Sequence, residues 1–453
     1  MVGVKAQSAA LLVALGSGSL ALAELKAGAA QRTITPDLDK HGPVYMAGFG
    51  HNRRATGIHD DLSARCLALQ PGPTPLVMCG VDSIGLFWDD VQKIRAAVRL
   101  KFDKADVIIA ALHDHEAPDT MGLWGPTASQ TGINEDYVSF LIQRTAEAAI
   151  DAIEHMQPAT LRLAKTHDPE LDTFIHDNRP PDVHDSEVIM ISVSTKNKKP
   201  IGTLLNWANH PETLASKNTE ITADYSGYLR TRLEQLLGGT AIFVNGAVGG
   251  MQSPLGAKFE NIPDSSFAKA KHIGKRVGEI ATEAMRSARP VAVTRYEFRE
   301  RMVDIPVDNK GFDQAAQADL YHGRKPTVAG HSTVPIGIVR LLNGKTPLLE
   351  IALVPGELYP ELSVGGVQRY EGADFADAPI EPAIKNMMRA PFRMLFGLAD
   401  DEIGYIIPVA EWDNKAPWLQ NAPKRWYGEV NSIGPEAAPI IARTLQQLFA
   451  SVR

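Results

Sequence analysis

The segment "IIAALHDHEAPDT", residues 108–120, places two histidines directly after a run of apolar residues. His113 and His115 are separated by Asp114, and side chains two apart on an extended strand point to the same face. Both imidazoles are therefore expected to face one crevice, with Asp114 turned away. Imidazole is a common zinc ligand and a common general acid or base near neutral pH. The segment alone is compatible with a metal site and with a plain polar turn.

Other apolar runs also end in residues that bind metals or take part in catalysis. His210 follows "PIGTLLNWA", Ser253 follows "TAIFVNGAV" and two glycines, and Glu357 follows "PLLEIALVP". Tyr405 lies in a short apolar run of its own. Histidine nitrogens together with glutamate and tyrosine oxygens form a ligand set that zinc accepts, with one position left for water or substrate. Read singly, each residue also fits a turn or a satisfied core position.

The elements that must position these residues alternate between two patterns. Short apolar runs rich in β-branched residues predict buried strands, and amphipathic stretches between them predict helices. Strands are expected within 25–36, 75–87, 105–112, 187–195, 200–208, 240–248 and 347–355, and helices within 134–156, 224–238, 270–288 and 434–453. Between about 290 and 345 the pattern loosens into either an inserted excursion or an antiparallel segment. We expect an α/β fold with a mixed, largely covered sheet and flanking helices, forming one large catalytic domain over residues 24–453.

Composition and the N-terminus limit the classes of function. The chain has 46 Lys and Arg against 53 Asp and Glu, a net charge of −7 without long single-sign runs, which argues against a nucleic-acid partner. Residues 1–23 have the order of a secretory signal peptide, so a periplasmic or secreted protein is expected. No other stretch has the roughly 18 to 20 apolar residues of a membrane span, so membrane contact would be transient and at the surface. Cys66 and Cys79 could form a disulfide or two buried thiols, and two cysteines are too few for a Cys-based metal site.

Taken in order, the motifs resemble the neutral/alkaline non-lysosomal ceramidase family. The resemblance runs over nearly all of the chain after residue 23. It is carried by the ordered set "MAGFG", "GIHDDLSARCLAL", "ALHDHEAPD", "HDNRPP", "NWANHPET", "ITADYSGYL", "VNGAVGGMQSP", "VPGELYPEL", "IGYIIP" and "YGEVNS". No one fragment is specific, whereas their order is.

The resemblance implies a set of site residues. One zinc ion per chain would be held by His113, His210, Glu357 and Tyr405. His115 would lie beside the reacting group as a proton shuttle. Ser253 would be a nucleophile or would orient the substrate, and we favour orientation because no base adjoins it in sequence. Tyr427 and Arg179 would stabilise the developing oxyanion. Gly48 would lie near the substrate, as would the two acids beside the histidines, Asp114 and Glu116.

Three departures from the family pattern bear on the substrate. The sequence has "HDHEAP" where the family has His-Thr-His-Ser-Gly-Pro, and Met251 stands where the family has an aspartate. The family's C-terminal β-sandwich has no counterpart before the last residue, Arg453, so a catalytic domain alone is expected. Aromatic residues in 85–90, 121–126 and 410–429 either line the pocket or are ordinary core and surface residues. Residues 390–400 either form an apolar lip or, as we prefer, a buried helix.

The leading hypothesis is a zinc-dependent hydrolase that cleaves an N-acyl amide in a ceramide-like or other hydrophobic substrate. A zinc-dependent esterase or lactonase on the same scaffold is the alternative. A non-catalytic exported binding protein is a third hypothesis, and the presence of all four ligand positions argues against it. The oligomeric state is not indicated by the sequence.

Overall fold

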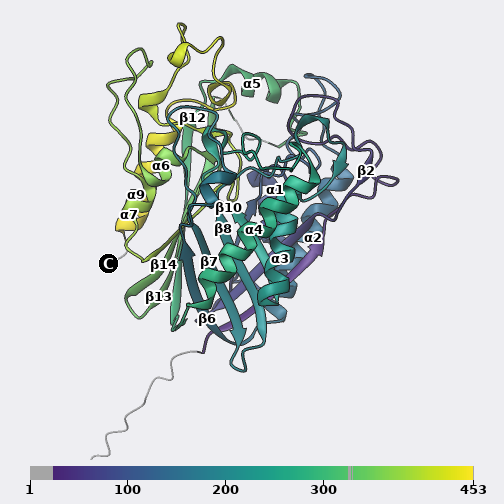
Figure 1. Ribbon diagram of the computed structural model, residues 1–453, viewed down its shortest axis with the longest axis vertical. Helices are drawn as coiled ribbons and strands as arrows, with labels where there is room; N and C mark the ends of the chain where they lie inside the picture. The colour runs from purple at the N-terminus through teal and green to yellow at the C-terminus, as the bar shows by residue number, and fades with distance from the viewer. Residues whose placement is uncertain (1–23, 325–327, 329, 452–453) are drawn as a thin grey trace, which may run out of the picture.

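The computed structural model describes residues 24–324, 328 and 330–451. The predicted signal peptide, residues 1–23, lies outside the described residues. The chain folds into four layers (Figure 1). Helices α1 to α4 cover one face of a large sheet, a smaller sheet packs against its other face, and α9 covers the outer face of the smaller sheet. The predicted α/β fold with a mixed, largely covered sheet in one domain is confirmed.

The large sheet has nine strands among the described residues and mixes both directions of pairing. Its order is β10-β8-β7-β6-β1-β3-β4-β5, with β11 paired to β6; β10–β8 and β4–β5 are parallel and the other pairs are antiparallel. Six of the seven runs predicted as strands lie in this sheet, and the seventh, 347–355, lies in the smaller sheet. The bounds of the strands in the large sheet are β1 Lys26–Thr33, β3 Ser63–Gln70, β4 Leu76–Val81, β5 Asp106–Ala111, β6 Gln157–Thr166, β7 Val188–Thr195, β8 Pro200–Trp207, β10 Thr240–Asn245 and β11 Pro290–Val291.

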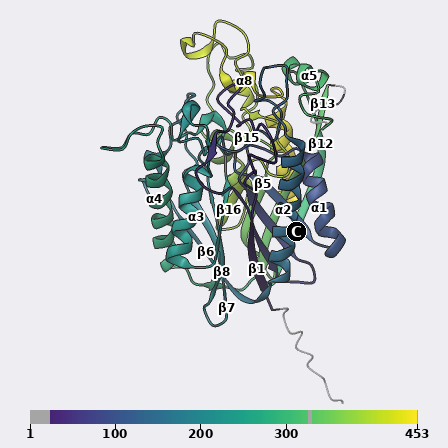
Figure 2. The ribbon, with the colours of Figure 1, turned by 90° about the vertical axis from the view of Figure 1, so that its right-hand side faces the viewer.

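The helices that cover this sheet form two pairs on its outer side, as the two views show (Figure 2). One apolar core joins β1, β3, β4 and β5 to α1 and α2, and another joins β7, β8 and β10 to α3 and α4. Residues of α4 such as Ile273, Val277 and Ile280 recur at helical spacing and are buried, because one face of the helix packs on the sheet. The bounds are α1 Trp88–Lys101, α2 Glu135–Glu154, α3 Asp224–Leu237 and α4 Phe267–Arg286.

Within residues 290–345, in which the apolar sequence pattern is loose, the chain forms an antiparallel pair of strands. These are β12 and β13, which pair over their whole length and continue into the smaller sheet in the order β12-β13-β14-β16. The expectation of a buried helix within 390–400 was wrong, because Phe392–Phe396 is strand β16 beside β14 and its apolar residues fill the core between the two sheets. The bounds are β12 Arg295–Pro306, β13 His331–Asn343, β14 Thr346–Leu353, α5 Lys310–Gln317 and α9 Ala437–Ala450.

Short helices and strands complete the fold, and α7 lies beside α9 on the left side of Figure 1. Two of the short strands, β15 and β17, form a small parallel pair, and β2 pairs with β9. The bounds are β2 Gly57–Ile58, β9 Glu220–Ile221, β15 Glu357–Leu358, β17 Tyr405–Ile406, α6 Pro360–Val364, α7 Ile384–Met387 and α8 Tyr427–Val430.

The large sheet curls so that strands from its two ends approach each other. A Cβ placed at Gly80 on β4 would lie 2.1 Å from the carbonyl oxygen of Phe243 on β10, so only glycine allows this approach. The Asn245 amide donates hydrogen bonds of 2.9 Å to the carbonyls of both Leu112 and Asn209. The chain segments after β5 and β8, which carry the predicted histidines, are therefore tied together by one buried side chain.

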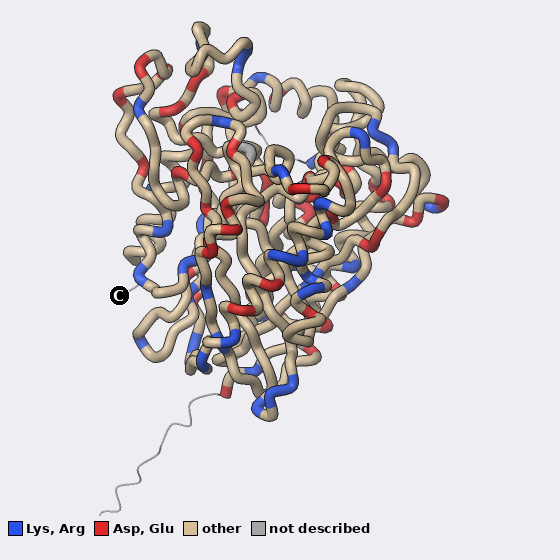
Figure 3. Tube along the Cα trace, in the orientation of Figure 1, with Lys and Arg blue, Asp and Glu red and all other residues tan. Residues whose placement is uncertain are grey.

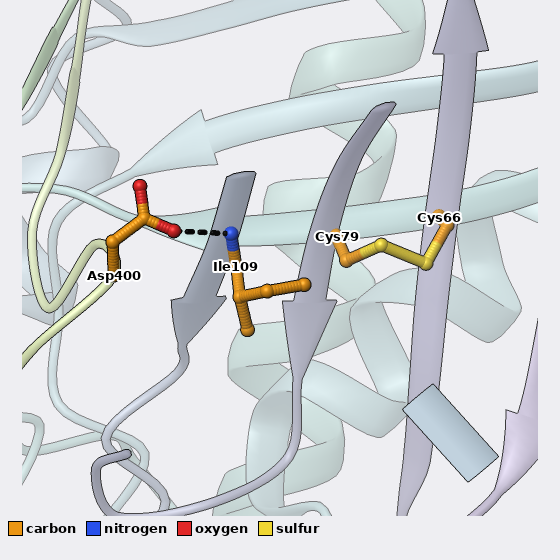
Figure 4. The surroundings of a disulfide bond; sticks show 4 residues. All are labelled: Cys66, Cys79, Ile109 and Asp400. Carbon is orange, nitrogen blue, oxygen red and sulfur yellow. Dashed lines mark hydrogen bonds between the residues drawn. A yellow bond between two sulfur atoms is a disulfide. The ribbon is translucent and has the colours of Figure 1, made fainter. Parts of the chain in front are cut away.

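The two cysteines form a disulfide between the paired strands β3 and β4 (Figure 4). Of the two alternatives for Cys66 and Cys79, the disulfide is therefore the one the structure has. Basic and acidic residues are dispersed over the trace (Figure 3), in agreement with the absence of long single-sign runs in the sequence. Within the described part of the chain, no helix combines the length and apolar character needed to cross a bilayer.

Candidate active site

His113 lies in a turn just beyond β5, which ends at Ala111. Its φ of 63° is a left-handed conformation that non-glycine residues rarely adopt and that often marks a functional site. The simple alternation of side chains along a strand is therefore not what orients the two histidines. Both imidazoles nevertheless face the same region, with ring centroids 4.9 Å apart. The His113 Nδ1 atom lies 2.7 Å from the carbonyl oxygen of Ile84, to which it donates a hydrogen bond when protonated.

His210 has the same arrangement in the loop after β8. Its Nδ1 atom lies 2.8 Å from the carbonyl of Gln252, so both rings are oriented by a backbone acceptor. Such a hydrogen bond keeps the proton on Nδ1 and leaves the Nε2 lone pair free for a metal. The Nε2 atoms of His113 and His210 lie 3.3 and 3.1 Å from Oε2 of Glu357. Ligand atoms about 2.0–2.1 Å from a tetrahedral zinc would be about 3.3 Å apart, so the three groups have the spacing of zinc ligands.

Tyr405 is held beside Glu357 by the small parallel sheet. Glu357 opens β15, Tyr405 opens β17, and the two residues are register partners. Both are buried, and both side chains line the same cavity. Burial and the Glu357 carboxylate raise the pKa of Tyr405 well above its usual value, so its hydroxyl keeps its proton unless a cation lies beside it. The four residues predicted as metal ligands are thus brought to one place.

His115 lies next to these groups and differs from them in its partners. The ligand nitrogens of His113, His115 and His210 all lie within 4.8 Å of one another, so the three could hold a metal ion together. Both ring nitrogens of His115 are buried without a hydrogen-bond partner, and no backbone carbonyl fixes its tautomer. Burial, together with the other two imidazoles and Arg53, lowers the pKa of His115 well below its usual value. An unpaired, neutral imidazole at this point is available to a metal, a substrate or a proton.

Gly48 supports the predicted position of His115. It has a φ of 73°, and a Cβ at this residue would lie 2.3 Å from Nδ1 of His115. The backbone of Gly48 therefore packs directly against the imidazole ring of His115, and any side chain at this position would displace the ring.

The cluster opens into a cavity of about 230 Å³ with mainly apolar walls. Five of the predicted site residues line it: His113, His115, Glu357, Tyr405 and Tyr427. The aromatic segments contribute Phe87 and Trp124, whereas the tryptophans of 410–429 are not among the lining residues. Helix α5 covers one side with Phe312 and Ala315. The walls are suited to a hydrophobic ligand that reaches the histidine cluster.

Ser253 is fully buried and is not among the residues that line the cavity. Its side chain is hydrogen-bonded to Glu212, whose carboxylate oxygen lies 3.6 Å from Nδ1 of His115. Glu212 is therefore a site residue that sequence reasoning missed. The available signal was an acid two positions after His210 in "NHPET".

Arg179 also lies behind the cavity wall. Its guanidinium donates hydrogen bonds of 2.6 Å to Oε2 of Glu429 and 3.2 Å to the hydroxyl of Tyr359. Glu429 belongs to α8, the same short helix that begins with Tyr427. Arg179 therefore holds the element that carries Tyr427, and its role at an oxyanion stays a prediction that this geometry does not favour. Tyr427 itself is 52% exposed at the rim of the cavity.

The two acids of "HDHEAP" are buried outside the cavity lining. Asp114 accepts the backbone N–H of Glu116, which agrees with the expectation that it turns away from the histidines. Glu116 accepts a hydrogen bond from Asn218 and lies 3.6 Å from Arg53, and burial raises its pKa to about 8. Their contact with substrate stays a prediction; their visible contacts hold the turn that carries the histidines.

The layered α/β fold with a polar cluster at the strand ends has counterparts among solved structures. The chain aligns with a neutral ceramidase from Pseudomonas aeruginosa at 17% identity and a TM-score of 0.73, covering 94% of this chain and 74% of that one. It also aligns with a ceramidase complexed with C2 at 16% identity and a TM-score of 0.70, covering 95% and 75%. No protein-family model matches the sequence. No curated protein matches it either. The chain therefore has the neutral ceramidase fold.

Proposed function

We propose that the protein is a zinc-dependent hydrolase of the neutral ceramidase type, which cleaves an N-acyl amide in a hydrophobic substrate. The observation that carries this proposal is the approach of the Nε2 atoms of His113 and His210 to one oxygen of Glu357, at 3.3 and 3.1 Å. The fold shared with two ceramidase structures supports it. The apolar walls of the adjoining cavity support a hydrophobic substrate.

One zinc ion per chain would be held by His113, His210, Glu357 and Tyr405. The histidines lower the pKa of Glu357 to about 2 despite its burial, so it offers a carboxylate rather than an acid. When bound, zinc would lower the pKa of a water molecule toward about 7 and polarise the acyl oxygen. The spare nitrogens of His115 remain available beside this set.

The chain's own groups supply the remaining chemistry. His115 would carry a proton to the leaving amine, because it is the unpaired imidazole on the cavity wall. The Tyr427 hydroxyl would stabilise charge on the acyl oxygen from the rim. Arg179 would act indirectly, by fixing α8 through Glu429. Ser253 would act through Glu212 beside His115 rather than as a nucleophile.

Paired substrates test the reaction. Purified protein is assayed on an N-acyl amide and on the ester of identical shape, and its metal content is measured by elemental analysis before and after chelation. We expect about one zinc per chain, amide cleavage that chelation abolishes, and recovery on adding zinc. Zinc with cleavage of the ester only would favour the esterase or lactonase. A chain without zinc or turnover would favour a binding protein.

We further propose that the protein is exported. The order of residues 1–23 supports a signal peptide, and the Cys66–Cys79 disulfide is of a kind that persists in oxidising compartments. Mass spectrometry of the mature protein would test this proposal, and a chain that still starts at Met1 would contradict it.

A further inference from the structure

One carboxyl group on the cavity wall has no role in the proposed metal set. Glu402 lies in the loop before β17, lines the cavity and is 2% exposed. Its Oε1 atom accepts a 2.7 Å hydrogen bond from the backbone N–H of Gly404, whereas Oε2 is buried without a partner. Among the described residues that line the cavity, only Glu402 and His115 have such unpaired buried atoms.

The surroundings of Glu402 make the unpaired oxygen costly. No Lys, Arg or His of the described residues forms an ion pair with it, and the sulfur of Met121 approaches the same small space above Gly85. A buried polar atom without a partner destabilises the folded protein, and a charged one does so more strongly. A carboxyl kept in an apolar wall at such a cost is suited to a ligand that supplies the missing donor.

The position of Glu402 indicates which part of a substrate would reach it. Glu402 lines the same cavity as Glu357 and lies three residues before Tyr405, the register partner of Glu357, and both of these residues belong to the proposed metal set. A donor that meets Glu402 would therefore lie close to the scissile bond rather than at the far end of an acyl chain.

We propose that Glu402 is a specificity-determining residue, which accepts a hydrogen bond from a hydroxyl or ammonium group near the scissile amide of the substrate. This inference rests on the proposed function. The substrate would combine an apolar body, held by walls such as Phe87, Trp124 and Phe312, with one hydrogen-bond donor near the amide.

The chain offers a conservative variant and a matched control. Glu402→Gln keeps the shape and an oxygen for the Gly404 N–H but places an amide N–H₂ where the second acceptor oxygen was. Glu381 resembles Glu402 in being buried, with one oxygen accepting a backbone N–H, from Val409, and the other oxygen unpaired. Glu381 lines a different cavity, so Glu381→Gln controls for the loss of a buried carboxyl.

The experiment measures kcat/KM of zinc-loaded protein for three amides with one acyl group and different amine parts: ethanolamine, ethylenediamine and propylamine. The first two distinguish a hydroxyl from an ammonium donor, and the third has neither. We expect the wild type to prefer one donor-bearing amide over the propylamide by about 10- to 100-fold, because the propylamide leaves the buried Oε2 atom of Glu402 without a partner. E402Q should reduce this preference to within about threefold, and E381Q should keep it.

A wild type without preference, or E402Q with the wild-type preference, would overturn the inference while leaving the proposed hydrolase intact. Binding of the same three amides to metal-free wild-type protein, measured by calorimetry, gives a readout that needs no turnover and no variant. There a donor-bearing amide should bind at least about 10-fold more tightly than the propylamide, and equal affinities would overturn the inference. If no amide is cleaved, the proposed function fails, and calorimetry still tests whether the cavity that Glu402 lines prefers a ligand with a hydrogen-bond donor.

Discussion

Two polar groups follow neighbouring strands of the large sheet and have opposite surroundings. Asp82 comes directly after β4, and its carboxylate receives two hydrogen bonds from Arg230, of 2.6 and 2.8 Å, and another from the backbone N–H of Ser63. His113 comes shortly after the parallel partner β5, in a cluster where Glu357 faces two imidazoles and His115 is unpaired. Both groups are buried and lie at the same edge of the sheet.

The two groups differ in the partners that their polar atoms have. Asp82 is paired by a guanidinium from α3, so the ion pair is closed and suited to holding helix to sheet. The histidine cluster keeps nitrogens and a carboxylate oxygen at ligand spacing next to a cavity. Burial of polar groups alone therefore does not identify a site. The presence of unpaired atoms that converge on a cavity is the more informative observation.

The largest effect that would sharpen this comparison is expected from His210→Ala. Loss of one proposed zinc ligand should remove bound zinc and reduce kcat/KM by about a thousandfold. A catalytic metal lowers the barrier by several kcal/mol, and each factor of ten in rate corresponds to about 1.4 kcal/mol. Elemental analysis and amide hydrolysis would measure both changes. His41→Ala is the control, since the Nδ1 atom of His41 accepts the N–H of Asp37 and is already satisfied. A fully active, zinc-loaded H210A protein would contradict the site.

Breaking the ion pair between Asp82 and Arg230 should lower the free energy of unfolding and leave the metal content unchanged. Asp82→Ala leaves the Arg230 guanidinium buried without its bidentate partner, and removing one member of such a pair costs about 3–5 kcal/mol. We expect the lower end, about 3 kcal/mol, because Asp114 and Asp60 also act on Arg230. Urea unfolding in the presence of chelator measures the change, and zinc per folded chain should stay at the wild-type value. Loss of zinc without loss of stability would reverse the roles of the two regions.

Much of the fold could be predicted from the residues because each element carries its own signal. The period-3.6 apolar pattern of residues 134–156 and 270–288 predicted α2 and α4, and β-branched runs predicted six of the nine strands that the described residues form in the large sheet. Residues 390–400 were assigned to a helix because a short apolar run fits both states. Their identity as β16 depends on β14 alongside, a contact between segments far apart in the chain.

The proposed ligand residues were assigned mostly through the resemblance, whereas the residues that hold them in place could not be predicted. His113, His210, Glu357 and Tyr405 were assigned by motif, and the structure brings them together. Nothing in the local sequence indicates that Asn245 joins Leu112 and Asn209, since this depends on the curl of the whole sheet. The engagement of Arg179 by Glu429 likewise joins residues 250 positions apart. Glu402, three residues before Tyr405, was overlooked because its unpaired oxygen is a property of the packed structure.

A smaller effect is expected when the space beside the His115 imidazole is reduced and all four proposed zinc ligands are kept. Gly48→Ala places a methyl group where Nδ1 of His115 lies 2.3 Å away, at a φ of 73° that disfavours alanine. Displacement of the imidazole should lower kcat by about 10- to 100-fold, with zinc content unchanged because His115 is not in the proposed ligand set. Parallel measurement of kcat and zinc tests this separation. Full activity in G48A, or loss of zinc with it, would show that the role assigned to His115 is wrong.

A pH-dependent effect on stability is expected from a third kind of buried carboxyl. Asp177 accepts the backbone N–H of Arg179 at 3.0 Å but, unlike Asp82, forms no ion pair among the described residues. Burial raises the pKa of Asp177 to about 8. Between its unfolded pKa near 4 and this value, the folded chain keeps a proton that the unfolded chain has released. The free energy of unfolding therefore falls as pH rises through this window and levels off above about pH 8.

Asp177→Asn keeps the acceptor for the Arg179 N–H and removes the titration. The wild type should lose up to about 1.4 kcal/mol per pH unit more than the variant between pH 5 and 7, the limit for one proton. Urea unfolding of both chains at pH 5, 6 and 7 measures the difference. Parallel curves for the wild type and D177N would mean that Asp177 is ionised in the folded chain, and that the Arg179 region resembles the closed pair at Asp82 more than its contacts indicate.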